Sequence, residues 1–449
     1  MNFKFKNLGL IEFADIEVGG LTVITGLNDT GKSFLGKTIF SIVKTINRAE
    51  RIYASFKVSR ISQLSQQIFQ SHRQIVPFTK EKSQQFHPRN ITNIVYPYLF
   101  QEANKNSTDA EIIDNIKTYI GSVISDLKAY EIIVPHLTKQ IDNSISLINS
   151  AQTEILSIFQ ENVSKEQKYK NYFDSQIIDR FFQSQINSLV KESILNIEVK
   201  QGATEILSLI VKGNRTDSFN LNPPFLINDA TIIETPTIIQ LEQFISNSFL
   251  TTDDYYQERA DLPFHYGDLV QKIGVPIIPK DTPFIDIYEK IRGIINGELI
   301  INQNSGVIEY IKETKENKIV INAPNIASGI KSFGILQMLI KNGWVSPNRY
   351  LIIDEPEVHL HPSWEVLYGE IIVLLSQLKI PIIISTHSSY ILESILVHSK
   401  LYGTEDNTKY YFGKKQKDKA SSRFTPMTGN LDPIFKTLSD PMQHLFEKS

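Results

Sequence analysis

The segment from Gly26 to Ser33 reads G-L-N-D-T-G-K-S, a match to the spacing G-x-x-x-x-G-K-S. Gly26 and Gly31 allow the backbone to curl so that successive N–H groups point at one anion. Lys32 would reach the β- and γ-phosphates of a nucleotide, and the Ser33 hydroxyl would bind Mg²⁺. These residues predict a phosphate-binding loop, and the competing interpretation is an ordinary glycine turn.

Two adjacent carboxylates, Asp354 and Glu355, follow the apolar run 350–353. A strand ending there would deliver them to the carboxyl edge of a parallel sheet, where ligands bind. Asp354 would hold Mg²⁺, directly or through water, and Glu355 would orient or deprotonate the attacking water. A second apolar run, 380–384, leads to His387, which would approach the γ-phosphate from the next strand end. A simple turn is the alternative for the Asp-Glu pair, but the strands and the helix expected around it favour a site.

The phosphate loop needs a strand before it and a helix after it. Residues 21–25 are apolar or β-branched and predict a buried strand, and 34–47 carry apolar residues at helical spacing, without Pro or Gly after Gly36. Alternating residues at 3–5 and 11–18 predict two antiparallel strands beside the site. An aromatic side chain there could stack on adenine, although a place in the core is favoured. Further strands are expected at 195–199, 206–211, 231–234, 298–301, 307–311 and 318–321, and helices at 237–249 and 284–295.

The middle of the chain changes composition. Residues 50–194 are rich in Gln, Ser, Asn, Lys and Ile, and Thr108 with Glu111 forms a capping box before a helical apolar stripe. We therefore expect a compact helical insertion, 50–194, between two parts of one ATPase-like domain, 1–49 and 195–449. Its apolar stripes would serve internal packing or contact another protein, and internal packing is favoured. No strict heptad continues for many turns, so a long coiled coil is not expected.

Bulk composition limits the classes of protein. The 449 residues include 46 basic and 49 acidic ones, a net charge of −3, so no overall basic field predicts nucleic-acid binding. Cysteine is absent, which excludes disulfides, zinc–thiolate sites and thiol catalysis. No apolar run reaches 18 residues, and the N-terminus alternates like a strand. We expect a cytoplasmic protein without a membrane span.

Taken together, these motifs resemble those of ABC-type P-loop ATPases, in the OLD-like and SMC-related branch. That branch includes the AAA-family ATPase subunits of bacterial antiphage systems such as Septu and PARIS. The resemblance covers residues 1–48 and about 293–395. Residues 26–33 match Walker A, 351–355 match Walker B, and His387 matches the switch histidine. The branch's degenerate signature motif is matched by Ser328, Gly329, Lys331 and Ser332, and its H-L-H-P ending by 358–362.

The resemblance implies an α/β fold, an ABC-type P-loop NTPase with a mixed central sheet and a helical insertion domain. It also implies ATP hydrolysis with Mg²⁺, with Glu355, His387 and Lys32 as catalytic residues and Ser33 and Asp354 as metal ligands. The working unit would be a head-to-tail homodimer or a larger assembly of dimers, with the Ser328 helix of a second copy closing the site. The nucleotide contacts would be Gly26, Asn28, Asp29, Thr30, Gly31, Lys32, Ser33, Thr38, Ser328 and Gly329.

Some features depart from the family pattern. Acidic Asp29 replaces a small residue in the loop and would oppose phosphate unless it points away or caps a turn, so hydrolysis could be slow. Three glutamines could be the family's Q-loop residue, and none can be assigned: Gln63, Gln66 and Gln67. His359 and His361 lack further ligands, which favours a structural or dimer-contact role over a metal site. The basic run 414–419 is expected to be a solvated loop rather than a nucleic-acid contact.

No nuclease domain is recognisable after the switch histidine, so an effector activity would belong to a separate nuclease or toxin. The first hypothesis is an ATPase that controls such an effector in antiphage defence. The second is an SMC-like ATPase of DNA repair or chromosome organisation, for which nucleic acid is a possible partner. The nucleotide subunit of a membrane transporter is a third and weaker hypothesis, because the chain has a helical insertion and no standard signature motif.

Overall fold

The computed structural model describes residues 1–100, 108–186, 194–241, 263–275, 284–302, 304–313, 317–416, 420–427 and 429–438. The chain forms two compact units, Met1–Asn47 together with Tyr169–Ser449, and Arg48–Lys168. This division differs from the boundary expected at residue 194. The reason is packing: Tyr169 and Phe173 lie against Phe219 of the sheet, with ring centroids 5.3 and 6.1 Å apart.

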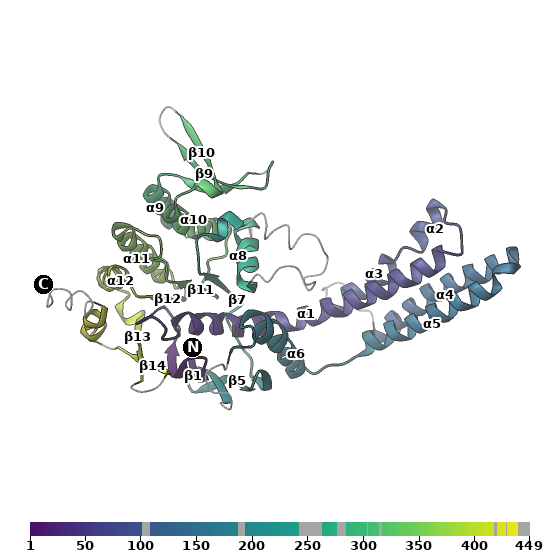
Figure 1. Ribbon diagram of the computed structural model, residues 1–449, viewed down its shortest axis with the longest axis horizontal. Coiled ribbons are helices and arrows are strands. Elements are labelled where there is room, and N and C mark those ends of the chain that lie inside the picture. The colour runs from purple at the N-terminus through teal and green to yellow at the C-terminus, as the bar shows by residue number, and fades with distance from the viewer. Residues whose placement is uncertain are drawn as a thin grey trace. The chain divides into compact units, whose positions relative to one another are not determined.

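The first unit is built on a large mixed sheet with strand order β6-β5-β4-β1-β2-β14-β13-β3-β12-β11-β7 (Figure 1). The five neighbours β13, β3, β12, β11 and β7 are parallel, so their carboxyl ends share one edge. The strands are β1 (Asn2–Leu8), β2 (Ile11–Glu17), β3 (Leu21–Gly26), β4 (Ile194–Gln201), β5 (Thr204–Lys212), β6 (Arg215–Leu221), β7 (Asp229–Ile233), β11 (Arg349–Asp354), β12 (Ile382–Thr386), β13 (Thr408–Lys415) and β14 (Ser422–Pro426).

The parallel strands are buried on both faces, as expected of strands that carry helices on each side. Val23, Ile353 and Ile384 belong to the core shared with the later helices. The alternate residues Ile352 and Ile383 face α1 (Lys32–Arg73), the helix after the phosphate loop. The opposite layer contains α8 (Phe264–Gly274), α9 (Ile285–Ile295), α10 (Ser328–Lys341), α11 (Pro362–Gln377) and α12 (Ser389–Leu401).

A second sheet, β10-β9-β8, is the expected antiparallel meander of β8 (Glu298–Ile301), β9 (Ile308–Glu313) and β10 (Lys318–Asn322). It contacts α10 through Leu299, whose side chain packs against Gly334. A Cβ at Gly334 would lie 1.7 Å from Leu299 Cδ1, so this glycine permits the close approach. The meander therefore packs against the helical layer rather than against the large sheet.

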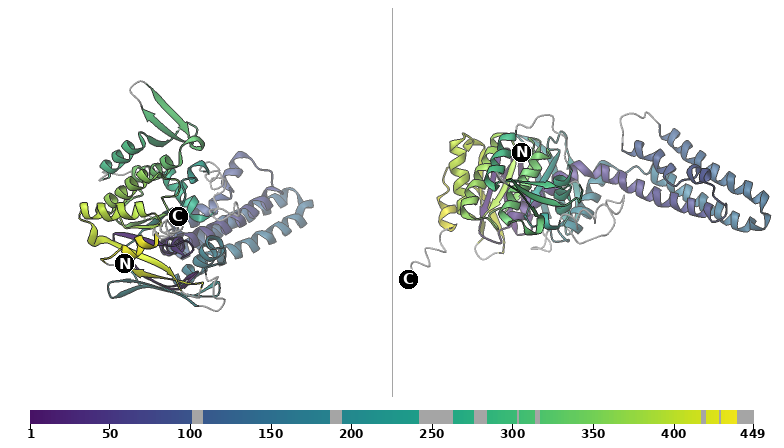
Figure 2. Two further views of the ribbon diagram at one scale, coloured as in Figure 1. Left: turned by 60° about the vertical axis from the view of Figure 1, so that its left-hand side comes forward. Right: turned by 90° about the horizontal axis from the view of Figure 1, so that it is seen from above.

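The unit Arg48–Lys168 is helical and has a core of its own. Thr108 and Glu111 make the expected capping box at the start of α4 (Asp109–Ile133), which packs beside α5 (Thr138–Gln160) (Figure 2). The part of α1 from Arg48 to Arg73 also belongs to this unit and adds Ile61, Leu64 and Ile68 to its core. Two shorter helices pack with it, α2 (Lys80–Gln85) and α3 (Arg89–Leu99). Two of the three expected apolar stripes are buried inside this unit, which confirms internal packing for them: Ile112, Ile116, Val123 and Leu127, and Ile141, Ile148, Ile155 and Phe159. The third stripe, Ile178, Phe182 and Ile186, is buried in the other unit, and its last residue, Leu189, lies outside the described residues.

The expected fold class is confirmed: an α/β P-loop NTPase fold with a mixed central sheet and a helical insertion. The antiparallel pair β1 and β2 is confirmed too, with Phe3 and Phe5 in the core. The helix expected to end at residue 47 continues to Arg73, because neither Pro nor Gly occurs between 37 and 73. The helix expected at 237–249 lies mostly outside the described residues.

The interpretation of the basic run as a solvated loop is wrong for its first two residues. Lys414 and Lys415 end β13, which pairs in parallel with the phosphate-loop strand β3 and antiparallel with β14. Residues 408–413 are largely buried because they continue the central sheet. This strand was not predicted because the basic residues at its end obscure the apolar segment before them.

Candidate functional site

The loop after β3 has the backbone conformation that its glycines predicted. Gly26 has φ +150° and Gly31 φ +91°, values that side-chain-bearing residues rarely adopt. The Lys32 side chain is 4% exposed, and its ammonium donates to the carbonyls of Gly26 (3.1 Å) and Leu27 (3.2 Å). The loop thus curls around the lysine that follows it, and α1 begins at once.

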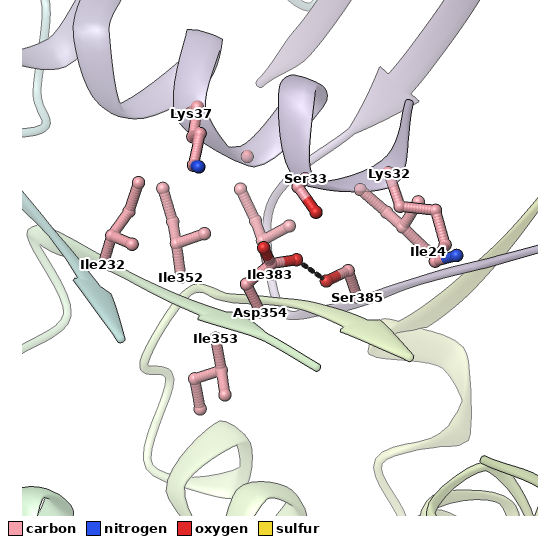
Figure 3. Close-up of a pocket in the computed structure, with 11 residues that line it drawn as sticks. Ile24, Lys32, Ser33, Lys37, Ile232, Ile352, Ile353, Asp354, Ile383 and Ser385 are labelled. Atoms are coloured by element: carbon pink, nitrogen blue, oxygen red, sulfur yellow. Dashed lines mark hydrogen bonds between the residues drawn. The ribbon is translucent and has the colours of Figure 1, made fainter. Parts of the chain in front are cut away.

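Ser33 and Asp354 lie on opposite sides of a small cavity between α1 and the strand ends (Figure 3). The cavity measures 10 Å³, about the room that one water needs. Asp354 ends β11 and accepts a hydrogen bond from the hydroxyl of Ser385 on β12. Burial raises the pKa of Asp354, and hydrogen bonds from Ser385 and Ser33 act in the opposite direction. A buried carboxylate facing a hydroxyl is an oxygen donor pair that suits a small divalent cation.

Glu355 lies between two of the other predicted catalytic side chains. Its Oε1 is 3.7 Å from Lys32 Nζ and 3.6 Å from His387 Nδ1. Its backbone N–H donates to the carbonyl of Ser385 (3.0 Å), and its φ is +45°. A positive φ is uncommon for a glutamate, and the tight pairing with β12 holds it there. The sheet therefore brings Lys32, Glu355 and His387 together as the sequence predicted.

His387 is held by a carboxylate that was not among the predicted site residues. Glu357 Oε1 accepts from the backbone N–H of His387 (2.7 Å) and from the Thr386 hydroxyl (2.9 Å), and it lies 3.1 Å from the ring Nδ1 of His387. Burial raises the pKa of Glu357, and the contacts with His387 act in the opposite direction. Glu357 is thus a positioning residue for His387. The signal was present as the second glutamate of the D-E-P-E sequence.

A second group that was not predicted lies at the end of β7. Glu234 Oε1 accepts from Lys37 Nζ (2.6 Å), and Glu234 Oε2 lies 2.5 Å from His265 Nε2. Burial would raise the pKa of Glu234, but His265 and Lys37 outweigh it and lower the pKa to about 2. β7 is parallel to β11, with Ile233 opposite Ile353. Glu234 therefore follows its strand at the same edge as Asp354, with Lys37 of α1 beside the cavity (Figure 3).

A buried charge network fastens α1 to β7 and α8. Lys44 donates to Asp229 and to Asp268 (2.7 Å), and Lys272 lies 2.7 Å from Asp229 Oδ2 and 2.9 Å from Asp268 Oδ2. Both lysine side chains are at most 1% exposed. Among the described residues, this network joins two lysines to two aspartates, and it fixes the helix that carries Lys32.

Other predicted contacts lie elsewhere. Thr38 is buried on α1, and its hydroxyl donates to the Phe34 carbonyl of the same helix (2.7 Å). Asn28 is exposed on the loop, and the Thr30 hydroxyl donates to the Leu27 carbonyl (2.9 Å). Ser328 and Gly329 begin α10, where Gly329 packs against Trp364. No described contact brings these two residues to the phosphate loop of their own chain.

The histidine pair has a partly structural explanation. His361 caps α11, its Nδ1 accepting from the Ser363 N–H (3.3 Å), and His359 adopts φ +75° in the preceding turn. Among the described residues, no group of three or more His, Cys, Asp or Glu is placed to hold a metal ion.

The three glutamines at 63, 66 and 67 are exposed on α1 within the helical unit. No described helix combines the length and apolar character needed to cross a bilayer.

Comparison with known proteins gives one match to a family model. Residues 227–393 match the family described as "AAA domain, putative AbiEii toxin, Type IV TA system", a segment that contains Asp354, Glu355 and His387 but not the phosphate loop. No curated protein sequence shows significant similarity to the chain.

Several solved structures resemble the chain at low identity. One is an SMC head domain from Thermotoga maritima, with 11% identity and a TM-score of 0.36 over 95% of this chain and 98% of that one. Another is an SMC head bound to the C-terminal winged-helix domain of ScpA, with 12% identity and a TM-score of 0.43 over 96% and 98%. With TM-scores this low the superpositions are poor, and the fold assignment rests on the strand order and the strand-end residues of this chain.

Proposed function

We propose that the chain is a Mg²⁺-dependent ATPase whose ATP-dependent dimerisation controls a separate effector protein. The observation that carries the ATPase proposal is the convergence of Lys32, Glu355 and His387, with contacts of 3.7 and 3.6 Å at one sheet edge, beside Ser33 and Asp354. The test is direct: Lys32→Ala should abolish ATP binding, and Glu355→Gln should bind ATP but hydrolyse it far more slowly. Wild-type turnover in Glu355→Gln would exclude Glu355 as the base.

Each residue has a defined part in this chemistry. Lys32 leaves its loop carbonyls to bind the β- and γ-phosphates, together with the N–H groups of the loop. Ser33 and Asp354 would hold Mg²⁺, which neutralises phosphate charge when bound. Glu355 orients or deprotonates the attacking water, and His387, held by Glu357, contacts the γ-phosphate side. The reaction is phosphoryl transfer to water.

In the proposed dimer, a helix end from a second copy would complete the site. Ser328 and Gly329 lie at the N-terminus of α10 and are half-buried. In a head-to-tail pair, that positive helix end could cover the γ-phosphate of the other copy and exclude water. ATP would then stabilise the closed dimer, and hydrolysis would release it. Ser328→Arg should abolish ATP-dependent dimerisation while leaving ATP binding to the monomer unchanged.

We further propose that the effector is a nuclease or toxin of a bacterial antiphage system. The family matched by residues 227–393 carries a toxin–antitoxin description, which fits a role in such a system. The test is co-purification with the products of neighbouring genes, with ATP, with ADP and without nucleotide. Absence of any partner in all three conditions would contradict this part of the proposal and leave the ATPase assignment intact.

An SMC-like role on DNA is the second candidate, favoured by the long helices of the insertion. α1 has 42 residues, and α4 and α5 have 25 and 23, lengths of about 35 to 63 Å at 1.5 Å per residue. Helices of this kind could carry a signal away from an ATPase head. Hydrolysis strongly stimulated by duplex DNA at physiological salt would favour this candidate, and unchanged hydrolysis would favour the first.

A further inference from the structure

The acidic residue of the phosphate loop is held in an unusual conformation. Asp29 has φ +63°, in the left-handed region that aspartate tolerates better than most residues. Its carboxylate side chain is 70% exposed. A fixed negative charge in a loop whose N–H groups bind phosphate opposes the binding of a polyanion. Lys32 is the one basic residue in the loop sequence 26–33, and it is to bind the phosphates themselves, so compensation of Asp29 needs a second positive charge from elsewhere.

That charge comes from the far end of the chain. The hairpin β13–β14 packs against the loop, with Gly413 opposite Gly26 in register and the Ser422 hydroxyl donating to the Thr30 carbonyl (2.6 Å). A Cβ at Gly26 would lie 2.6 Å from the Gly413 carbonyl oxygen, so the two backbones are in close contact. This contact fixes where β13 ends relative to the loop.

Two lysines end β13, and they differ in what they contact. Lys415 Nζ lies 3.0 Å from Asp29 Oδ2. Lys414 Nζ lies over the ring of Phe412, 5.3 Å from its centroid. Successive side chains of a strand point to opposite faces, which is why only one of the two meets the loop. The pair Lys415–Asp29 removes the net charge of the acidic residue.

We propose that Lys415 is a nucleotide-affinity determinant: it neutralises Asp29 and so allows the acidic loop to bind the phosphates of ATP. The inference rests on the proposed function and names a residue outside its motifs. The mechanism is electrostatic and local. It requires Lys415 only while residue 29 is acidic, and it weakens as salt screens the exposed pair.

The experiment is a double-mutant cycle on ATP affinity, measured by calorimetry with Mg²⁺ in about 50 mM salt, where screening is weak. Lys415→Gln should weaken binding about two- to fivefold, the effect expected for an exposed charge pair. Asp29→Asn keeps a residue that tolerates positive φ, and in that background Lys415→Gln should have no effect. Lys414→Gln is the matched control, because it removes the same charge from the neighbouring position. The Lys414→Gln protein should bind ATP with the affinity of the wild type.

Each of the other possible results supports or overturns the proposed role of Lys415. A loss from Lys415→Gln that persists in the Asp29→Asn background overturns charge compensation in favour of direct phosphate contact. An equal loss from Lys414→Gln, or no loss from Lys415→Gln, overturns the special role of Lys415. Repeating the titrations in about 0.5 M salt should reduce the difference between Lys415→Gln and the wild type. If the wild type itself binds no ATP, the proposed function has failed, and the inference falls with it.

Discussion

Glu357 offers the most informative perturbation of the site, because it touches His387 and not the phosphate loop. Its Oε1 accepts from the backbone N–H of His387 (2.7 Å) and from the Thr386 hydroxyl (2.9 Å). In Glu357→Ala both donors lose a buried acceptor, at about 1–3 kcal/mol each, so the protein should lose about 2–6 kcal/mol of stability. Glu357→Gln keeps an acceptor oxygen and loses only the charge, a smaller cost of about 1 kcal/mol per bond.

The same two variants should separate stability from turnover. Glu357→Gln should fold and bind ATP as the wild type does, since no contact with Lys32 or Ser33 changes. Its hydrolysis rate should fall about 10- to 100-fold, because His387 loses the charged partner 3.1 Å from Nδ1 that orients its ring. The assays are urea denaturation, calorimetric ATP binding and phosphate release.

A matched control lies in the same region. Glu365 of α11 is also a buried carboxylate, and it accepts from the Ser388 hydroxyl rather than from His387. Glu365→Gln should cost stability without slowing hydrolysis by more than about twofold. Equal rate losses in the two Gln variants, or wild-type turnover in Glu357→Gln, would refute the idea that Glu357 positions His387.

Three further predictions concern charge. Lys44→Met should lower the free energy of unfolding by about 3–5 kcal/mol in chemical denaturation, because Asp229 and Asp268 lose one of the two buried lysines that contact them. The affinity for Mg²⁺, measured through Mg²⁺-dependent nucleotide binding, should fall as pH decreases, because a proton on Asp354 competes with the ion. The fall should begin above pH 3.8, the ordinary pKa of an aspartate, because the pKa of Asp354 is raised. Glu234→Gln should destabilise the fold at neutral pH and approach the wild type as pH falls from 4.5 toward about 2, because the pKa of Glu234 is lowered and its contribution is lost over that window.

The functional residues at the strand ends could be predicted from the sequence because each lies within or next to one short apolar run. An apolar run followed by Asp354 and Glu355, or leading to His387, fixes both the strand and the position of its last side chain. The same rule applied to the run before Glu234 would have found it, since it too follows a buried parallel strand. The phosphate loop, with Lys32 and Ser33, was predictable for the same reason.

Long-range pairs could not be predicted in this way. Lys37 and Glu234 are 197 residues apart, and Asp29 and Lys415 are 386 apart. Their contact depends on strand order, which places β7 beside β11 and β13 beside β3. Periodicity within a segment carries no information about which strands become neighbours. For Asp29 the sequence therefore indicated an unfavourable charge in the loop, and its pairing with Lys415 is seen only in the fold.

The central claim is that Mg²⁺ and ATP join two copies of the chain through the site at the strand ends. The most direct measurement is sedimentation velocity of Glu355→Gln, which should retain bound ATP, with Mg²⁺ and ATP at concentrations shown by calorimetry to saturate it. The account predicts a dimer with ATP and a monomer with ADP or with Lys32→Ala added. A saturated Glu355→Gln protein that sediments identically with ATP, with ADP and without nucleotide would contradict it.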